Sequence, residues 1–318
     1  MKLGFMALFV WLMLLTNGQL VDISSSSTTS QPLANTVEIS TRRNLRPRGE
    51  EYDVLVVSGG GTGCSNLLAK LGRVRRPNKK GEVSKLMLNH LANEDRLKHA
   101  YPDRFKDMKI NTGIIYVIGN LTLAVKSLVR RHFTHVQVNV LGGNRKWMEE
   151  QKYTTPGGAE VKTLFLHKPK EEKKVDKELE SLINLNAIRL RRVLAAAGNT
   201  DEDPIGLVKH FNTWLEFTSR PRSYPILFLN LNRLKPNSTD MKLLVDFLNA
   251  TELKESSFQY KPHRRKGLDL LEASMNFSGS SAEIPDSTGY VTPENVLKGL
   301  SYYERQTRIQ DQMHGKIL

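Results

Sequence analysis

A segment of small residues that reads Ser58-Gly59-Gly60-Gly61-Thr62-Gly63-Cys64-Ser65 follows an apolar run and has the composition of a phosphate-binding loop. Such a loop points backbone N–H groups at one cluster of oxygen atoms and has a helix N-terminus behind it. The segment differs from the Walker pattern Gly-x-x-x-x-Gly-Lys-Ser/Thr, because Ser58 replaces the first glycine and Cys64 replaces the lysine. It also differs from the dinucleotide pattern Gly-x-Gly-x-x-Gly, whose last glycine would fall at Cys64 or Asn66. An ordinary ATPase site and an ordinary dinucleotide site are therefore both disfavoured.

Two other interpretations of this segment stay open. A glycine-rich turn between a strand and a helix needs no ligand. Alternatively, Cys64 would stand at a helix N-terminus, where the pKa of a thiol is lowered, and would serve as a hydrolase nucleophile. The sequence shows no base that is paired with this cysteine.

Two further groups of residues would suit an anionic ligand. Ser127 stands eight positions after Gly119, and Arg130 and Arg131 follow on the same predicted helix. Arginine is well suited to bidentate contacts with phosphate. His99 follows Lys98, so a base and a positive charge would lie next to each other. The simpler interpretations are an exposed basic helix end and a solvated histidine.

The hydrophobic pattern predicts the elements that position these residues. Apolar runs rich in β-branched residues predict buried strands at 52–58, 113–118 and 224–231. Apolar residues at helical spacing and capping residues predict helices at 64–71, after Asn120, over a charged stretch at 168–194, at 239–248 and from Thr292-Pro293 onward. Buried strands that alternate with helices predict an α/β fold, with a central parallel sheet and helices on both faces.

The order of these segments resembles that of the sulfotransferase-like P-loop family, which also departs from the Walker pattern. The family's first strand ends in Pro-Lys-Ser-Gly-Thr-Thr; here Thr62 to Ser65 stand at Ser-Gly-Thr-Thr, and Gly61 stands at the basic position. Its next motif is Arg-Asn-Pro-x-Asp-x-x-x-Ser; here Gly119 replaces the arginine, whereas Asn120 and Ser127 match. The stretch 96–102 resembles Lys-Thr-His-x-Pro, with His99 at the histidine. Weaker likenesses are the late strand from Tyr224 and Arg264-Arg265-Lys266-Gly267, which is similar to an Arg-Lys-Gly motif.

The resemblance covers residues 51–318 and implies a three-layer P-loop fold. It implies transfer of a sulfuryl group from 3′-phosphoadenosine 5′-phosphosulfate (PAPS) to a hydroxyl acceptor, without a metal ion. His99 would take the proton of the acceptor, and Lys98 would offset charge on the transferring group. The residues that would bind the donor are Gly60, Gly61, Thr62, Gly63, Cys64, Ser65, Gly119, Ser127, Arg130, Arg131 and Arg265.

The N-terminal composition predicts entry into the secretory pathway. The apolar run 3–15 follows Lys2 and is shorter than the roughly 20 residues of a membrane span. Residues 1–19 are therefore predicted to be a signal peptide or a short membrane anchor, and the Ser/Thr-rich, then basic residues 20–50 a stem or linker. Four Asn-x-Ser/Thr sequons fit a glycoprotein of the Golgi lumen or a secreted one; they begin at Asn120, Asn237, Asn249 and Asn276.

The formal net charge of +14 favours anionic partners. The expected acceptor is a glycan or a secreted protein, and nucleic acid is disfavoured because the basic runs lack interleaved aromatic residues. The basic residues missing at Gly61 and Gly119 leave open a catalytically degenerate sulfotransferase-fold protein that binds an anionic ligand or glycan. A nucleotide kinase-like phosphotransferase would need a lysine and an acidic magnesium ligand where this chain has Cys64 and Asn230.

Overall fold

The computed structural model describes residues 51–77, 81–89, 96–151, 153–154, 160–161, 164–165, 185–250, 274–275 and 289–318. The predicted signal or anchor segment, the predicted stem and Arg265 lie outside these ranges. None of the helices in the described part is both long enough and apolar enough to span a membrane.

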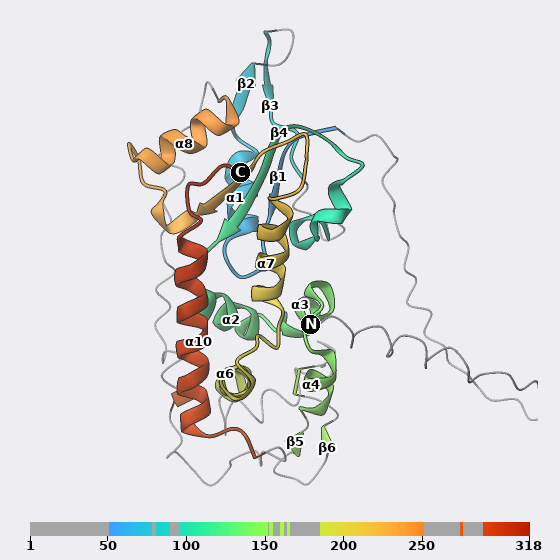
Figure 1. The fold of residues 1–318 in the computed structure, drawn as a ribbon, viewed down its shortest axis with the longest axis vertical. Helices are drawn as coiled ribbons and strands as arrows, with labels where there is room; N and C mark the ends of the chain where they lie inside the picture. Colours follow the sequence, from blue (N-terminus) through green and yellow to red (C-terminus); the bar gives the residue numbers. More distant parts are fainter. Residues whose placement is uncertain are drawn as a thin grey trace, which may run out of the picture. The chain divides into compact units, whose positions relative to one another are not determined.

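The described elements alternate between strands and helices through much of the chain (Figure 1). The strands are β1 (Glu51–Val57), β2 (Arg75–Pro77), β3 (Val83–Lys85), β4 (Lys109–Ile118), β5 (Tyr153–Thr154), β6 (Glu160–Val161) and β7 (Ile226–Asn230). The α-helices are α1 (Cys64–Leu71), α2 (Leu121–Arg130), α3 (Thr134–Leu141), α4 (Arg145–Glu150), α6 (Leu185–Thr200), α7 (Leu207–Phe217), α8 (Thr239–Leu248) and α10 (Pro293–Asp311). Short 3₁₀ turns are η1 (Arg96–His99), η2 (Pro102–Phe105) and η3 (Leu231–Arg233).

The main sheet is parallel and has the strand order β1-β4-β7. In its register, Val57 lies opposite Tyr116, and Tyr116 lies opposite Phe228. An isolated bridge joins Leu88 to the outer side of β1, and residues 315–318 pair antiparallel with β7. The predicted α/β fold with a central parallel sheet is therefore confirmed.

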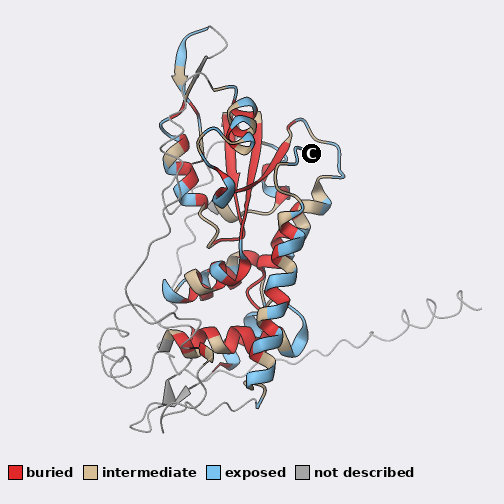
Figure 2. Ribbon diagram, turned by 90° about the vertical axis from the view of Figure 1, so that its left-hand side faces the viewer, coloured by how far each residue is buried: buried red, intermediate tan, exposed pale blue. Residues whose placement is uncertain are grey.

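Helices cover both faces of this sheet, whose strands are coloured as buried in Figure 2. One face packs against α1 and α8 in a cluster that includes Val56, Ile115 and Leu227. The opposite face packs against α7 in a cluster that includes Tyr116 and Trp214. Alternate residues along one strand thus face different helices, which explains why these strands read as continuous apolar runs.

A separate cluster joins α2, α3, α4, α6 and α10, with residues of α7. Within it, α6 and α10 approach so closely that only glycine fits at their crossing. A Cβ atom on Gly198 would lie 1.9 Å from the carbonyl oxygen of Asn295, and one on Gly299 would lie 1.9 Å from that of Leu194. These two glycines allow the backbones of the helices to pack against each other.

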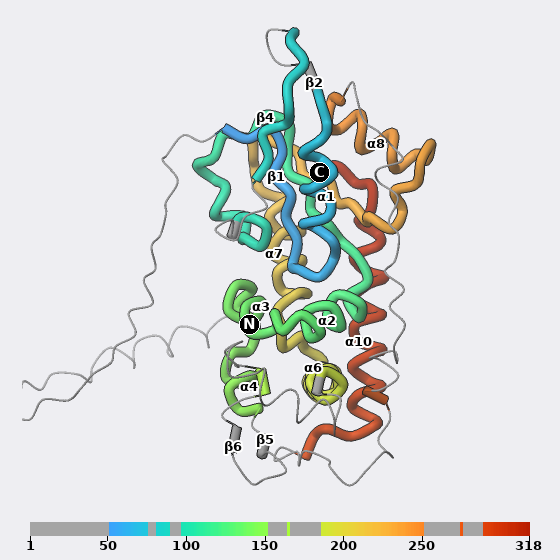
Figure 3. Tube along the Cα trace, turned by 180° about the vertical axis from the view of Figure 1, so that it is seen from behind, coloured from blue at the N-terminus to red at the C-terminus, as the bar shows by residue number. Residues whose placement is uncertain are grey.

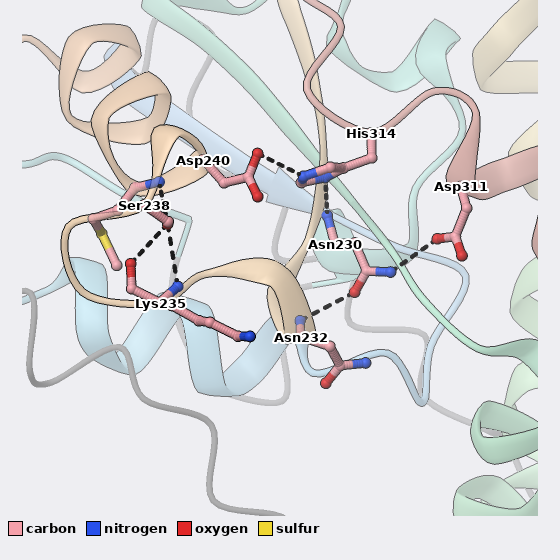
Figure 4. A network of polar contacts seen from close by, with 8 residues as sticks. Asn230, Asn232, Lys235, Ser238, Asp240, Asp311 and His314 are labelled. Carbon is pink, nitrogen blue, oxygen red and sulfur yellow. Dashed lines mark hydrogen bonds and ion pairs between the residues drawn. The ribbon is translucent and has the colours of Figure 1, made fainter.

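The polar network in Figure 4 fixes the end of β7. The Asn230 side chain donates to Asp311 at 2.9 Å and accepts from the Asn232 amide at 3.0 Å, while its own backbone N–H donates to Nδ1 of His314 at 3.0 Å. On the other side of the ring, Nε2 of His314 lies 3.0 Å from the Asp240 carboxylate, though off the line of a hydrogen bond. The network ties β7, α8 and the segment after α10 together.

The local sequence signals predicted several elements well. The helices predicted at 64–71 and 239–248 are confirmed with the same bounds. The predicted cap Asn120 accepts a hydrogen bond from the first turn of its helix, and Pro293 begins α10 as predicted, with Thr292 as its cap. The strand predicted from 113 begins earlier, at Lys109. Of the long helix predicted over 168–194, the structure describes only the part from Leu185, and this helix continues to Thr200.

Candidate functional site

The glycine-rich segment forms the turn between β1 and α1, at the carboxyl end of the sheet. Thr62 at the tip of this turn donates from its hydroxyl to the carbonyl of Val117 in β4, at 3.3 Å. A Cβ atom on Gly119, just after β4, would lie 3.6 Å from the side chain of Thr62. The structure therefore brings the two predicted donor-binding turns together at the edge of the sheet where ligands of open α/β folds bind.

Two helices pack directly on this turn, and Figure 3 shows the turn next to α2. Gly60 and Gly61 have left-handed φ angles of 105° and 72°. A Cβ atom on Gly61 would lie 2.7 Å from the backbone of Ala124 in α2, and one on Gly60 would lie 2.0 Å from Nε2 of Gln137 in α3. Both the backbone conformation and the space therefore require glycine here, so position 61 has no room for the basic residue that the family carries.

The N-terminus of α1 has no side-chain cap. Gly63 is its N-cap residue, and the N–H groups of Asn66 and Leu67 donate to the Gly63 carbonyl. Among the residues that the structure describes, none accepts a hydrogen bond from the N–H groups of Gly61, Thr62, Gly63 or Ser65. Unused N–H groups and the positive end of the helix dipole would suit an anion at this turn.

His99 lies against the start of the same turn. Its Nδ1 atom is 2.7 Å from the carbonyl oxygen of Ser58, and the N–H group of Ser58 donates to the carbonyl of Lys98 at 2.8 Å. Because a carbonyl oxygen only accepts, Nδ1 carries the proton and Nε2 carries a lone pair. The predicted solvated histidine is thus partly buried and held in the tautomer that a general base needs.

The electrostatic surroundings keep His99 neutral. Burial lowers its pKa, the hydrogen bond to Ser58 partly opposes this effect, and the positive charges of Lys98 and Arg131 lower the pKa further. A neutral imidazole at neutral pH is the form that accepts a proton.

Arg131 comes to this site from the end of α2. Its Nε atom donates to the backbone carbonyl of Ser127 at 3.1 Å, and its guanidinium lies 5.4 Å from the centre of the Phe133 ring. Burial, and then the charge of Arg130, lower the pKa of Arg131. The structure therefore joins Ser127 and Arg131 in one turn of helix and brings the charge of Arg131 close enough to act on His99.

Cys64 is buried, and its thiol lies 3.5 Å from the carbonyl oxygen of Val56, on the side of the sheet. This orientation directs the sulfur into the core that α1 forms with the sheet. The hydrolase interpretation, with Cys64 as an exposed nucleophile, gains no support from this arrangement.

Sequence reasoning missed three residues that hold the site together. Gln137 donates to the carbonyl of Gly59 at 3.2 Å, and the Tyr116 hydroxyl lies 2.9 Å from Nδ1 of the buried His210. Tyr116 reads as an ordinary core aromatic in a strand, and Gln137 and His210 lie in helices without a motif. Only their long-range contacts reveal a role, so no local signal could have found them.

The described residues contain no cluster of three or more histidine, cysteine, aspartate or glutamate side chains that could hold a metal ion. No protein-family model matches this chain, and neither the comparison with curated proteins nor that with solved structures found a match.

Proposed function

We propose that this chain is a sulfotransferase-like enzyme of the secretory pathway, with a three-layer P-loop fold. It would transfer a sulfuryl group from PAPS to a hydroxyl of a glycan or a secreted protein. The observation that carries this proposal is the contact between His99 Nδ1 and the Ser58 carbonyl, at 2.7 Å. It holds a base, with its lone pair free, on the very turn that would bind the donor.

The residues at the turn fit an anionic donor in part. The unused N–H groups of Gly61, Thr62, Gly63 and Ser65 would contact the 5′-phosphosulfate, and Ser127 with Arg131 would contact the 3′-phosphate. Bound there, the donor supplies the sulfuryl group. His99 accepts the proton of the acceptor hydroxyl at Nε2, while Lys98 and Arg131 stabilise negative charge that develops nearby.

A second function, that of a degenerate member that binds an anionic ligand or glycan, is favoured by one observation. Ala124 and Gln137 occupy the space where side chains at Gly61 and Gly60 would lie, so the turn offers backbone groups alone. A charged hydrogen bond left unmade weakens binding by about 1.5–3 kcal/mol, a loss that a purely binding protein tolerates more easily than an enzyme.

The test is calorimetric titration of the purified protein with 3′-phosphoadenosine 5′-phosphate, with ATP as the comparison ligand. We expect roughly micromolar binding that prefers the 3′-phosphate and weakens about 10- to 100-fold in Arg131→Ala. Ser127→Ala should also weaken it, whereas Arg145→Ala, which removes an exposed arginine of α4, is the matched control.

Three results separate the two functions. Binding together with sulfuryl transfer to a hydroxyl acceptor that His99→Gln abolishes supports the enzyme. Binding without transfer to any phenol, hexose or tyrosyl peptide acceptor supports the degenerate member. Absence of binding by a folded protein overturns the nucleotide site altogether.

A further inference from the structure

A fully buried histidine on α7 lies between the glycine-rich turn and the segment that carries His99. The Nε2 atom of His210 is 3.1 Å from the carbonyl oxygen of Ala100, and its Nδ1 atom is 2.9 Å from the hydroxyl of Tyr116. Because the carbonyl only accepts, Nε2 carries the proton and Nδ1 accepts from the tyrosine hydroxyl. Both ring nitrogens of His210 are thus used inside the core.

Further contacts connect the surroundings of His210 to the glycine-rich turn and to the segment of His99. On one side, α7 packs on the turn, since a Cβ atom on Gly59 would lie 3.2 Å from the side chain of Leu207. On the other side, the indole of Trp214 donates to the Ala100 carbonyl at 3.1 Å. A path of contacts therefore runs from Gly59 through α7 to Ala100, and the Tyr116 hydroxyl of β4 is bonded to its centre. Its two ends are the direct neighbours of Ser58 and His99, the pair whose contact defines the candidate base.

The ring of His210 has little freedom to move. The Tyr101 ring meets it edge-on, with centroids 4.9 Å apart, and the Tyr116 ring lies 5.7 Å away. Burial lowers the pKa of His210 to about 4, so the ring is neutral at neutral pH and both hydrogen bonds keep their direction. A residue that only filled space here would be apolar, since each buried polar group must find a partner.

We infer that His210 is a positioning residue for His99, an inference that rests on the proposed role of His99 as the base. By holding the Ala100 carbonyl and the Tyr116 hydroxyl, on a helix whose Leu207 packs on Gly59, His210 fixes the distance between the two segments. This keeps Nδ1 of His99 on the Ser58 carbonyl and leaves Nε2 free to accept a proton.

The test reads the tautomer of His99 directly, by long-range ¹H–¹⁵N correlation of its imidazole in the whole protein at neutral pH. In the native sequence we expect only the form protonated at Nδ1. His210→Phe removes both hydrogen bonds at similar side-chain volume, and we expect the His99 form protonated at Nε2 to appear. The Nδ1 proton of His99 should exchange about fivefold faster, the factor that corresponds to one ordinary hydrogen bond. His210→Gln still reaches Ala100 with its amide and should restore the native signal.

A merely structural role would give a different result. Leu244→Ala, on α8 at the opposite face of the sheet, destabilises the core without touching this path and should leave the His99 tautomer unchanged. If His210→Phe does not fold, His210→Asn takes its place, because asparagine keeps an acceptor for Tyr116 but is too short to reach Ala100. An unchanged His99 signal in the folded Phe or Asn variant overturns the inference. Nucleotide titration is independent of this readout, so failure of the proposed function and failure of the positioning role are distinguishable.

Discussion

Acidification should destabilise this fold through His210. The pKa of this residue is about 4 in the folded protein, because burial disfavours the charged ring, against an ordinary value of 6.5. A group whose pKa is depressed by folding contributes stability that is fully present above the pKa of the unfolded chain and is lost as pH falls toward the folded value. The window is therefore pH 6.5 to 4, and the unfolded chain binds more protons throughout it.

The magnitude follows from the size of the shift. A difference of about 2.5 pKa units, at about 1.4 kcal/mol per unit, corresponds to about 3.5 kcal/mol of unfolding free energy, of which about 3 kcal/mol is lost between pH 6.5 and 4. No discount for solvent screening applies, since the His210 side chain is fully buried. Burial also lowers the pKa of His99, so this residue adds to the loss of stability as the pH falls. Burial raises the pKa of Asp203, so Asp203 gains stability at acid pH and opposes that loss.

Urea unfolding at a series of pH values, for the native protein and for His210→Gln, isolates the contribution of His210. Asp203 is present in both proteins and cancels in the difference, as does most of the His99 contribution. We expect the native protein to lose about 3 kcal/mol relative to the variant between pH 6.5 and 4. Parallel stability curves over this range would refute the assignment of a buried, neutral His210.

Two further substitutions test how the turn and α2 are built. Gly61→Ala should destabilise the protein by about 1–3 kcal/mol more than Gly81→Ala in urea unfolding. Both positions have positive φ angles, but only a Cβ atom at 61 meets the backbone of Ala124. Equal losses of stability would show that the contact with α2 has no energetic cost. Asn120→Ala should lower the unfolding free energy by about 1 kcal/mol, because the Asn120 side chain accepts a hydrogen bond from the Leu123 N–H. Asn120→Asp removes the sequon but keeps the cap, so its stability should stay near that of the native protein. A similar loss in both variants would contradict the capping role.

The sequence predicted those parts of the fold whose causes are local. Helix α8 was predicted with its bounds because Met241, Leu244 and Leu248 recur at helical spacing. In the structure, Ser238 caps this helix by accepting a hydrogen bond from the Met241 N–H. The start of β4 was predicted too late, because three of the four strand residues before 113 are polar, namely Lys109, Asn111 and Thr112. They become a strand through their pairing with the start of β1, which no local pattern records.

The same distinction between local signals and long-range contacts applies to the candidate site. The glycine-rich turn, His99 and Ser127 carry residue types with recognisable chemistry, so the sequence pointed to them. Tyr116 and His210 are 94 residues apart, and each looks unremarkable in its own element. Their role arises only when β4 and α7 pack together, so it could not be predicted without the fold.

The two departures from the sulfotransferase-like pattern have different physical causes. At Gly61 the backbone is left-handed and α2 lies within 2.7 Å of a Cβ atom, so the missing basic residue follows from the way α2 packs on the turn. At Gly119 no positive φ angle is required, and the nearest atom, on Thr62, lies at an ordinary contact distance of 3.6 Å. A side chain at position 61 would separate α2 from the turn, whereas a Cβ atom at position 119 finds ordinary contacts. If the turn binds an anion, it does so through backbone N–H groups and the N-terminus of α1, and the positive charges that act on this site are those of Lys98 and Arg131. That arrangement lets the charge that would bind the donor also contribute to the lowered pKa of His99, after the larger effects of burial and Lys98.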